Sequence, residues 1–175
     1  MSYRPVIDLP AKTILKERES KPLIEELRRL PSLSQLSNKS RVELETVKDD
    51  EVVFVDGEPL VFRRKGELIP VLVNTSTLNG LPRVVVDMGA VPHVVAGADV
   101  MAPGIRKIQG EFVANELVGV TDEKHGKYLA IGKALIDSET MAGTKRGKVI
   151  GNLHYVGDAV WEAVKEFMRQ PAAFS

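Results

Sequence analysis

Cysteine is missing from this chain of 175 residues, and aromatic side chains make up only 5% of it. The lack of cysteine excludes disulfides and thiolate metal sites. The three histidines, His93, His125 and His154, are far apart in the sequence and form no H-x-x-x-H pair, so we expect neither a metal site nor a cofactor. The scarcity of aromatic rings argues against the stacking platforms with which many proteins bind single-stranded nucleic acids.

Long apolar runs are also missing. No stretch approaches the roughly 20 apolar residues that a membrane-spanning helix needs. The first residues, M-S-Y-R-P-V-I-D-L-P, lack the basic and then apolar layout of a signal peptide. We therefore expect a cytoplasmic protein without a membrane partner.

The chain has no excess of either charge, with 24 basic and 24 acidic residues. The residues up to Arg83 contain 14 basic and 13 acidic side chains, and the rest contain 10 and 11. Proteins that bind nucleic acid mainly by neutralising phosphates usually carry a strong basic excess. Any binding of RNA must therefore depend on a local patch or on shape.

The first 82 residues predict a helical segment packed on a small antiparallel sheet. Residues 1–9 predict an edge strand or an ordered arm, and residues 11–30 have the charged composition and apolar spacing of a helix. Ser20-Lys21-Pro22 predicts a break in that helix and a new start at Lys21. Apolar alternation then begins at Arg41, and Asp56-Gly57 between two apolar runs predicts a hairpin. The turn at residues 79–82 is the predicted domain boundary.

The second part opens with the segment around which the chain is organised, R-V-V-V-D-M-G-A-V-P-H-V-V-A-G-A-D-V-M-A-P-G-I-R from Arg83 to Arg106. Residues 84–86 predict a buried strand and residues 90–96 a short helix, which Gly97 ends. Proline lacks an N–H group, so Pro92 places the start of this helix near Gly89. Free N–H groups at a helix start attract anions, and here they should lie near the Pro103-Gly104 turn.

The remaining residues predict short strands at 116–121, 128–135 and 148–155, a capped helical turn at 137–142, and a helix at 159–168 that Gly157-Asp158 caps. Many short strands with few short helices favour a small barrel or sandwich. The predicted fold class is therefore α+β: a helix on an antiparallel sheet in residues 1–82, a β-barrel with short helices in residues 83–168, and a tail at 169–175.

The spacing of V-V-V-D-M-G-A-V, V-A-G-A-D-V-M-A-P-G-I, L-A-I-G and G-N-L-H-Y-V-G-D-A-V-W resembles the PUA domain, an RNA-binding barrel named after pseudouridine synthases and archaeosine transglycosylases. With D-G-E-P-L-V-F-R-R-K-G-E-L-I-P-V-L at residues 56–72, the chain resembles the malignant-T-cell-amplified-sequence family and its archaeal relatives. Those proteins carry a pre-PUA domain before the PUA domain and act in translation. The resemblance covers most of the sequence.

The resemblance implies a non-enzymatic protein that binds structured RNA, either tRNA or small-subunit rRNA, during initiation or recycling. It also implies a protein partner with an initiation-factor-like domain. The short helix, the glycine turn and the neighbouring cations would contact the RNA, and the residues assigned to this site are His93, Gly97, Ala98, Pro103, Gly104, Arg106, Lys107, Lys145, Arg146 and Lys148. If the strand after Gly104 lies near the strand that starts at Lys148, these cations form a patch of about five charges.

Several residues have simpler interpretations. Gly97, Pro103 and Gly104 are also ordinary turn residues, and a cluster of surface charges is usually just a solvated face. Arg63, Arg64 and Lys65 at a predicted hairpin tip are either solvated or a secondary RNA contact. Asp87 stands at a strand-to-helix corner, where a carboxylate stabilises the helix entry, so we assign no catalytic residue. We expect His154 to be a satisfied core or rim residue and Trp161 to be a core anchor.

Two rival hypotheses remain. One is an RNA-modifying enzyme or accessory subunit of the pseudouridine or archaeosine type, whose catalytic centre would have to lie in residues 1–82, which contain no histidine or cysteine. The other is a protein-interaction scaffold without affinity for RNA, which the neutral net charge keeps open. Assays of base modification, and a pull-down with and without ribonuclease, would separate these hypotheses from RNA binding.

Overall fold

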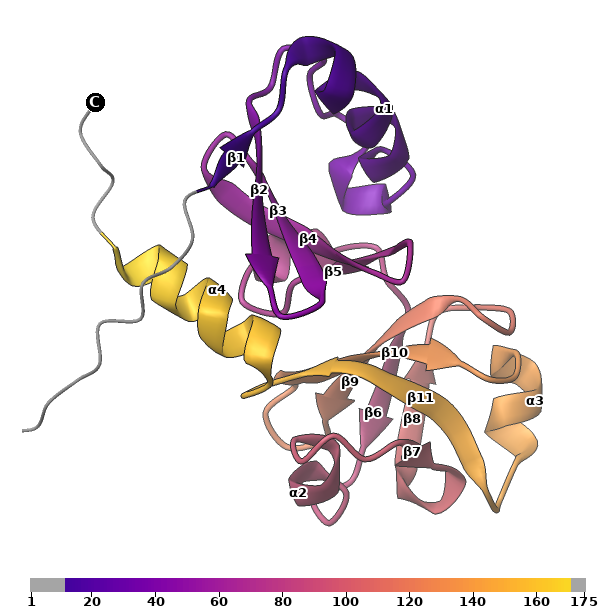
Figure 1. Ribbon diagram of the computed structural model, residues 1–175. Coiled ribbons are helices and arrows are strands. Elements are labelled where there is room, and N and C mark those ends of the chain that lie inside the picture. The colour runs from indigo at the N-terminus through magenta and orange to yellow at the C-terminus, as the bar shows by residue number, and fades with distance from the viewer. Residues whose placement is uncertain (1–11, 171–175) are drawn as a thin grey trace, which may run out of the picture.

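A computed structural model describes residues 12–170 of the chain as two sheets with short helices around them (Figure 1). The first sheet lies within residues 12–82, here called the first half, and the second lies within residues 83–170, the second half. This arrangement confirms the predicted α+β class. The edge strand or arm predicted within residues 1–9 lies outside the described residues.

The first sheet is antiparallel throughout, with its strands in sequence order. Its strands are β1 (Thr13–Ile14), β2 (Val42–Val47), β3 (Asp50–Val55), β4 (Glu58–Arg64) and β5 (Glu67–Pro70). The predicted hairpin at Asp56-Gly57 joins β3 to β4, and both turn residues have positive φ, as a two-residue hairpin turn requires. Lys65-Gly66 forms the same kind of turn between β4 and β5.

Helix α1 (Glu17–Leu27) packs on one face of this sheet through its buried residues Leu23, Ile24 and Leu27. The predicted break at Ser20-Lys21-Pro22 is wrong, because α1 continues through Pro22. The helix starts earlier, where the Lys16 N–H donates to Glu19 Oε2 at 3.0 Å. Proline removes one backbone hydrogen bond, and burial of the apolar face after it outweighs that loss.

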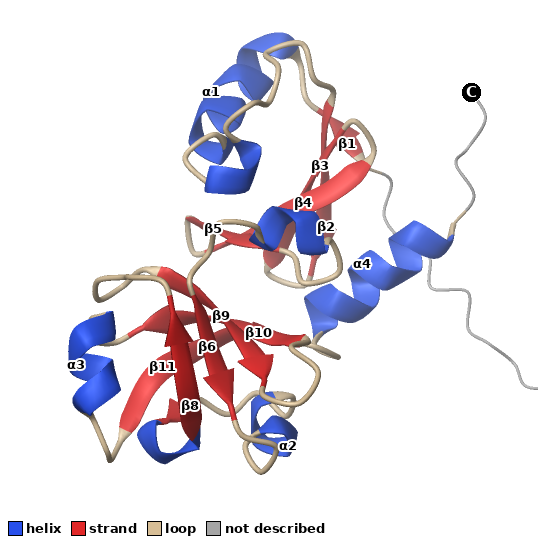
Figure 2. Ribbon diagram, turned by 180° about the vertical axis from the view of Figure 1, so that it is seen from behind, coloured by secondary structure: helices blue, strands red, loops and turns tan. Residues whose placement is uncertain are grey.

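The second sheet curls into a half-barrel (Figure 2) with the strand order β7-β11-β10-β9-β6-β8. Its strands are β6 (Arg83–Val86), β7 (Val100–Met101), β8 (Ile105–Gln109), β9 (Leu117–Asp122), β10 (Tyr128–Ala134) and β11 (Lys148–Tyr155). Strands β6 and β9 pair in parallel, and the other neighbours are antiparallel. Apolar side chains from these strands fill the inside of the curl.

Short helices cover the ends of the half-barrel. Helices α2 (Val91–Val94) and α3 (Ser138–Gly143) lie on opposite sides of it in Figures 1 and 2. Asp137 caps α3 by accepting the Thr140 N–H at 2.7 Å, as the sequence predicts. Short 3-10 helices, η1 (Pro31–Leu33), η2 (Thr75–Leu78) and η3 (Ala102–Gly104), complete the connections.

Helix α4 (Ala159–Arg169) follows the half-barrel in sequence but lies along β2 of the first sheet (Figure 1). Its buried residues Val160 and Val164 share one apolar cluster with Phe54 and Phe62 of the first half, and the Phe167 ring meets Phe54 edge-on at 5.6 Å. Trp161 is partly buried at the rim of this cluster. The two halves are therefore joined by a common core.

The predicted division into residues 1–82, 83–168 and 169–175 stays a prediction, and residues 171–175 lie outside the described part of the chain. Within residues 12–170 no helix is long and apolar enough to cross a membrane.

Candidate nucleic-acid interface

The strand-to-helix corner after β6 is built by Asp87. Its Oδ1 accepts the Ala90 N–H at 2.8 Å, and its own N–H donates to the Gly104 carbonyl at 2.9 Å. The predicted role of Asp87 at the helix entry is thus confirmed. Helix α2 is shorter than predicted, spanning only residues 91–94, with Ala90 as its N-cap and Pro92 in its first turn.

A groove of about 620 Å³ lies between α2 and the η3 turn. We call it the α2 groove, and it is lined by Asp87, Ala90, His93, Val94, Ala98, Asp99, Val100, Met101, Pro103, Gly104 and Lys148. Five of the residues assigned from sequence therefore meet in one place: His93, Ala98, Pro103, Gly104 and Lys148. Every lining residue belongs to the second half, so the described part of the first half does not cover the groove.

Close contacts within the protein explain why glycine occupies positions 97 and 104 at this corner. Gly97 has a φ of +94°, and a Cβ there would lie 3.0 Å from the Tyr155 ring. A Cβ on Gly104 would lie 3.3 Å from the Cβ of Ala90. Gly97 does not line the groove, and its interpretation as a turn residue is sufficient. Gly104 is part of the groove wall.

Carboxylates pair with two of the cations assigned from sequence. Lys148 Nζ lies 2.9 Å from Asp99 Oδ2, and Arg106 lies 3.4 Å from Asp87 and 3.7 Å from Glu123. The hydrogen bond from the Asn152 N–H, the hydrogen bond from Lys148 and the positive charge of Lys148 hold the pKa of Asp99 below its ordinary value, although partial burial opposes them. The groove therefore presents paired charges beside an apolar floor.

Three further cations are exposed and have no ion pair among residues 12–170: Lys107, Lys145 and Arg146. Arg106 and Lys107 on β8 line a smaller cavity together with Thr144, which directly precedes Lys145. Strands β8 and β11 are not hydrogen-bonded neighbours, since β8 pairs with β6 and β11 pairs with β10 and β7. The end of α3, and not a strand, brings Lys145 and Arg146 toward Lys107.

The three cations assigned to a secondary contact, Arg63, Arg64 and Lys65, lie at the end of β4 and in the turn after it. Arg63 binds Glu26 at 3.2 and 2.8 Å, and Arg64 binds Asp50 at 2.9 and 2.6 Å. Of these three, only Lys65, in the turn, is exposed. The two arginines are thus bound to carboxylates of the protein itself, and a secondary RNA contact at this tip stays a prediction that rests mainly on Lys65.

His154 is a buried and satisfied residue, as predicted. It is fully buried, its Nε2 accepts the Leu72 N–H at 3.1 Å, and its Nδ1 lies 2.7 Å from Asp158 Oδ2. In the described residues no three His, Cys, Asp or Glu side chains gather as metal ligands would.

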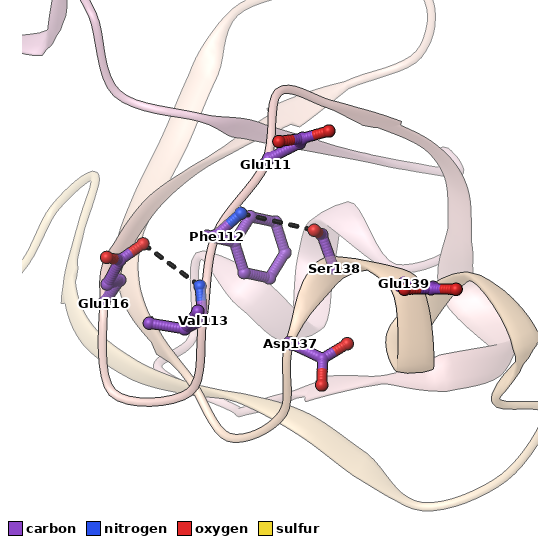
Figure 3. Close-up of a pocket in the computed structure, with 7 residues that line it drawn as sticks. All are labelled: Glu111, Phe112, Val113, Glu116, Asp137, Ser138 and Glu139. Atoms are coloured by element: carbon purple, nitrogen blue, oxygen red, sulfur yellow. Dashed lines mark hydrogen bonds between the residues drawn. The ribbon is translucent and has the colours of Figure 1, made fainter.

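A further cavity, of about 520 Å³, lies beside the start of α3 (Figure 3). Glu111, Glu116, Asp137 and Glu139 surround it, together with Phe112, Val113 and Ser138. Figure 3 shows Ser138 Oγ accepting the Phe112 N–H at 3.2 Å and Glu116 accepting the Val113 N–H at 3.1 Å. Four carboxylates repel phosphate, so we take the α2 groove as the candidate nucleic-acid interface.

Two residues near the groove were missed by sequence reasoning. Asp99 lines the groove and pairs with Lys148, and Asn152 on β11 hydrogen-bonds to Asp99 and to two groove-wall carbonyls. The sequence signal was weak: Asp99 is a polar residue directly before β7, and Asn152 is a polar residue within β11. Their partners lie about 50 residues away, at separations of 53 and 58 residues for Asn152.

Comparison with known proteins gives two family matches along the chain. Residues 82–156 match the PUA domain. Residues 11–74 match a domain of unknown function, DUF1947.

Three relatives each align with more than half of the chain. An uncharacterised protein of Methanocaldococcus jannaschii is 40% identical over 129 residues, which is 72% of this chain and 78% of that protein. Translation machinery-associated protein 20 of Saccharomyces cerevisiae is 29% identical over 87% of this chain and 84% of its own length. Human malignant T-cell-amplified sequence 2 is 33% identical over 63% of this chain and 64% of its own length.

Among solved structures, a hypothetical protein of Pyrococcus horikoshii superposes with a TM-score of 0.74 at 33% identity, covering 88% of this chain and 99% of that one. The likeness thus extends over both halves.

Proposed function

Because the chain belongs to the family of two-domain proteins in which a DUF1947 domain precedes a PUA domain, we propose that it binds structured RNA through the α2 groove and serves translation. The RNA is tRNA or small-subunit rRNA, and the step is initiation or recycling. A cytoplasmic location and a protein partner with an initiation-factor-like domain belong to the same proposal. The name of the yeast relative, translation machinery-associated protein 20, supports the assignment to translation.

The observation that carries the proposal is the position of the groove relative to the cations. Most of the residues that line the groove are apolar or glycine, and Lys148 lines it together with Asp87 and Asp99. Lys107 lines a smaller cavity together with Thr144, the residue before Lys145 and Arg146, and these three exposed cations are available for phosphates. This layout suits a folded RNA that places one part in the groove and its backbone along the cations.

The role is proposed to be non-catalytic. The relatives with a functional name are named for the translation machinery and not for a reaction. The rival hypothesis, an RNA-modifying enzyme, lacks a specific observation in its favour, and an assay of base exchange and pseudouridine formation tests it.

The proposal is tested with a variant whose larger side chain fills the groove. Ala98 is exposed and lines the groove, so Ala98→Trp should occupy the space with little effect on folding. Ala96 is exposed in the same loop but does not line the groove, which makes Ala96→Trp the matched control. In gel-shift titrations with tRNA and with small ribosomal subunits, we expect Ala98→Trp to bind at least about tenfold more weakly than the control.

Two results would count against the proposal. Absence of RNA binding by the wild-type protein would contradict the proposed function itself. Equal binding by the two tryptophan variants would show that the groove is not the binding site.

A further inference from the structure

We propose that the side-chain amide of Asn152 is a positioning residue that holds the wall of the α2 groove in its binding shape. This inference rests on the proposed function of the groove. Asn152 does not line the groove, and it would act on RNA through the residues that it holds.

The first step is the place of Asn152 on β11. Strand β7 pairs with β11 only at Lys148↔Met101 and Ile150↔Val100. Two residues further along β11, the Asn152 N–H has no β7 residue opposite it. The side chain of Asp99, which directly precedes β7, accepts this N–H at 2.8 Å instead. A groove residue thus completes the edge of the sheet.

The second step is the side-chain amide. Its Nδ2 donates at 3.0 Å to the carbonyl of Val94, the last residue of α2, and at 3.0 Å to the carbonyl of Ala98. One NH₂ group therefore joins the end of the helix to the loop that follows it. Val94 and Ala98 both line the groove, so the amide fixes the distance between two parts of its wall.

The orientation of the amide follows from its surroundings. Oδ1 is buried and has no hydrogen-bond partner among the described residues. Rotating the amide by 180° would place this oxygen against two carbonyl oxygens and would lose both hydrogen bonds. A buried acceptor without a partner costs free energy, which indicates that the two donated bonds decide the conformation.

The third step is the link between Asn152 and the charged residues of the groove. Asp99 also binds Lys148 at 2.9 Å, so Asn152, Asp99 and Lys148 form one connected set along the groove. Tyr155, three residues after Asn152 on β11, packs its ring against Gly97 in the same loop. Strand β11 therefore supports the loop at two points, and Asn152 supplies the hydrogen-bonded one.

The test compares Asn152→Ala with Asn74→Ala. Asn74 is the matched control because its Nδ2 also donates to a backbone carbonyl at 3.0 Å, that of Pro59, but in the first half. We expect Asn152→Ala to speed amide hydrogen exchange in residues 95–99 about tenfold and to weaken tRNA binding about tenfold. The control should leave both quantities unchanged. If Asn152→Ala does not fold, Asn152→Leu, which keeps the volume and lacks the donors, takes its place.

The outcomes separate this inference from the proposed function. If the wild-type protein binds no RNA, the proposed function fails, and with it any role of Asn152 in binding. If the wild-type protein binds and Asn152→Ala binds equally well, this inference alone is overturned, whether or not exchange in residues 95–99 changes. Weaker binding with unchanged exchange in those residues would also overturn it, because the wall would not have moved.

Discussion

Arg64 and Leu153, which are 89 residues apart in the chain, join the two halves of the molecule. The guanidinium donates to the Leu153 carbonyl while it binds both oxygens of Asp50. Leu153 is the bulged residue of β11, since Asn152 pairs with Gly132 and His154 with Ile131. The bulge turns this carbonyl toward the first half, directly beside the residue that holds the groove wall.

Removing this connection should cost stability. We expect Arg64→Ala to lower the free energy of unfolding by about 2 kcal/mol, because it removes charge-assisted hydrogen bonds and leaves Asp50 without a partner. Urea denaturation measures the change. Lys65→Ala is the control, since Lys65 is exposed and should matter by less than about 0.5 kcal/mol. Similar unfolding of the two variants would show that the contact contributes little.

Asp158 should make the protein sensitive to acid. It caps α4 by accepting the Trp161 N–H at 2.8 Å, and it also accepts from His154 and from the Tyr155 N–H. Burial alone would raise the pKa of Asp158, but these hydrogen bonds together lower it below the ordinary 3.8. A carboxyl whose pKa is lowered by folding contributes stability above its ordinary pKa, and that stability is lost as the pH falls through the lowered value.

The corresponding variant is Asp158→Asn. We expect it to be less stable than the wild type by about 1–2 kcal/mol at pH 7. In urea denaturation at a series of pH values, this gap should close as the pH falls below 3.8. A gap of constant size from pH 7 to pH 2 would mean that the charge of Asp158 has no part in stability.

Glu45 should affect the pH dependence of stability in the opposite direction to Asp158. It is 2% exposed, and neither carboxylate oxygen has a hydrogen-bond partner in the described part of the chain. Burial raises the pKa of Glu45 above its ordinary 4.5, and the charge of Lys12 opposes this only in part. Because folding favours the neutral form, the contribution of Glu45 to stability is most favourable below pH 4.5 and is lost as the pH rises through the raised value.

Replacing Glu45 should therefore stabilise the protein. We expect Glu45→Leu to raise the free energy of unfolding at pH 7 by about 2 kcal/mol, with a smaller gain at pH 4. Glu45→Gln, which removes the charge and keeps the shape, separates the effect of charge from that of polarity. Loss of stability in both variants at pH 7 would indicate that the carboxylate has a favourable partner.

Strands and helices in both halves could be predicted where the signals are local. Asp137 and Asp158 cap helices with bonds that span three residues, and Asp56-Gly57 sets its own hairpin. The continuation of α1 through Pro22 could not be predicted, because the burial that compensates for proline is contributed by the sheet.

The groove was predicted in part. His93, Pro103 and Gly104 lie in one stretch of sequence and converge as expected. Asp99 and Asn152 were missed because their roles depend on the pairing of β7 with β11, which no local pattern encodes. For the same reason, the ion pairs that neutralise Arg106 and Lys148 were visible only in the structure.

Those ion pairs change the expected salt dependence of RNA binding. With five available cations the slope of log affinity against log salt would be about −3.5, but the three unpaired cations Lys107, Lys145 and Arg146 predict about −2. Filter binding of tRNA at several salt concentrations measures it. Lys107→Gln combined with Lys145→Gln and Arg146→Gln should bring the slope close to zero, and an unchanged slope would place the phosphates elsewhere.

The most direct measurement is ultraviolet crosslinking of the protein to bound tRNA, followed by mass spectrometry of the crosslinked peptides. Our account predicts crosslinks within residues 87–107 and 144–152, which line or flank the α2 groove. Crosslinks confined to residues 12–82, or to the carboxylate-lined cavity at Glu111 and Glu139, would contradict it.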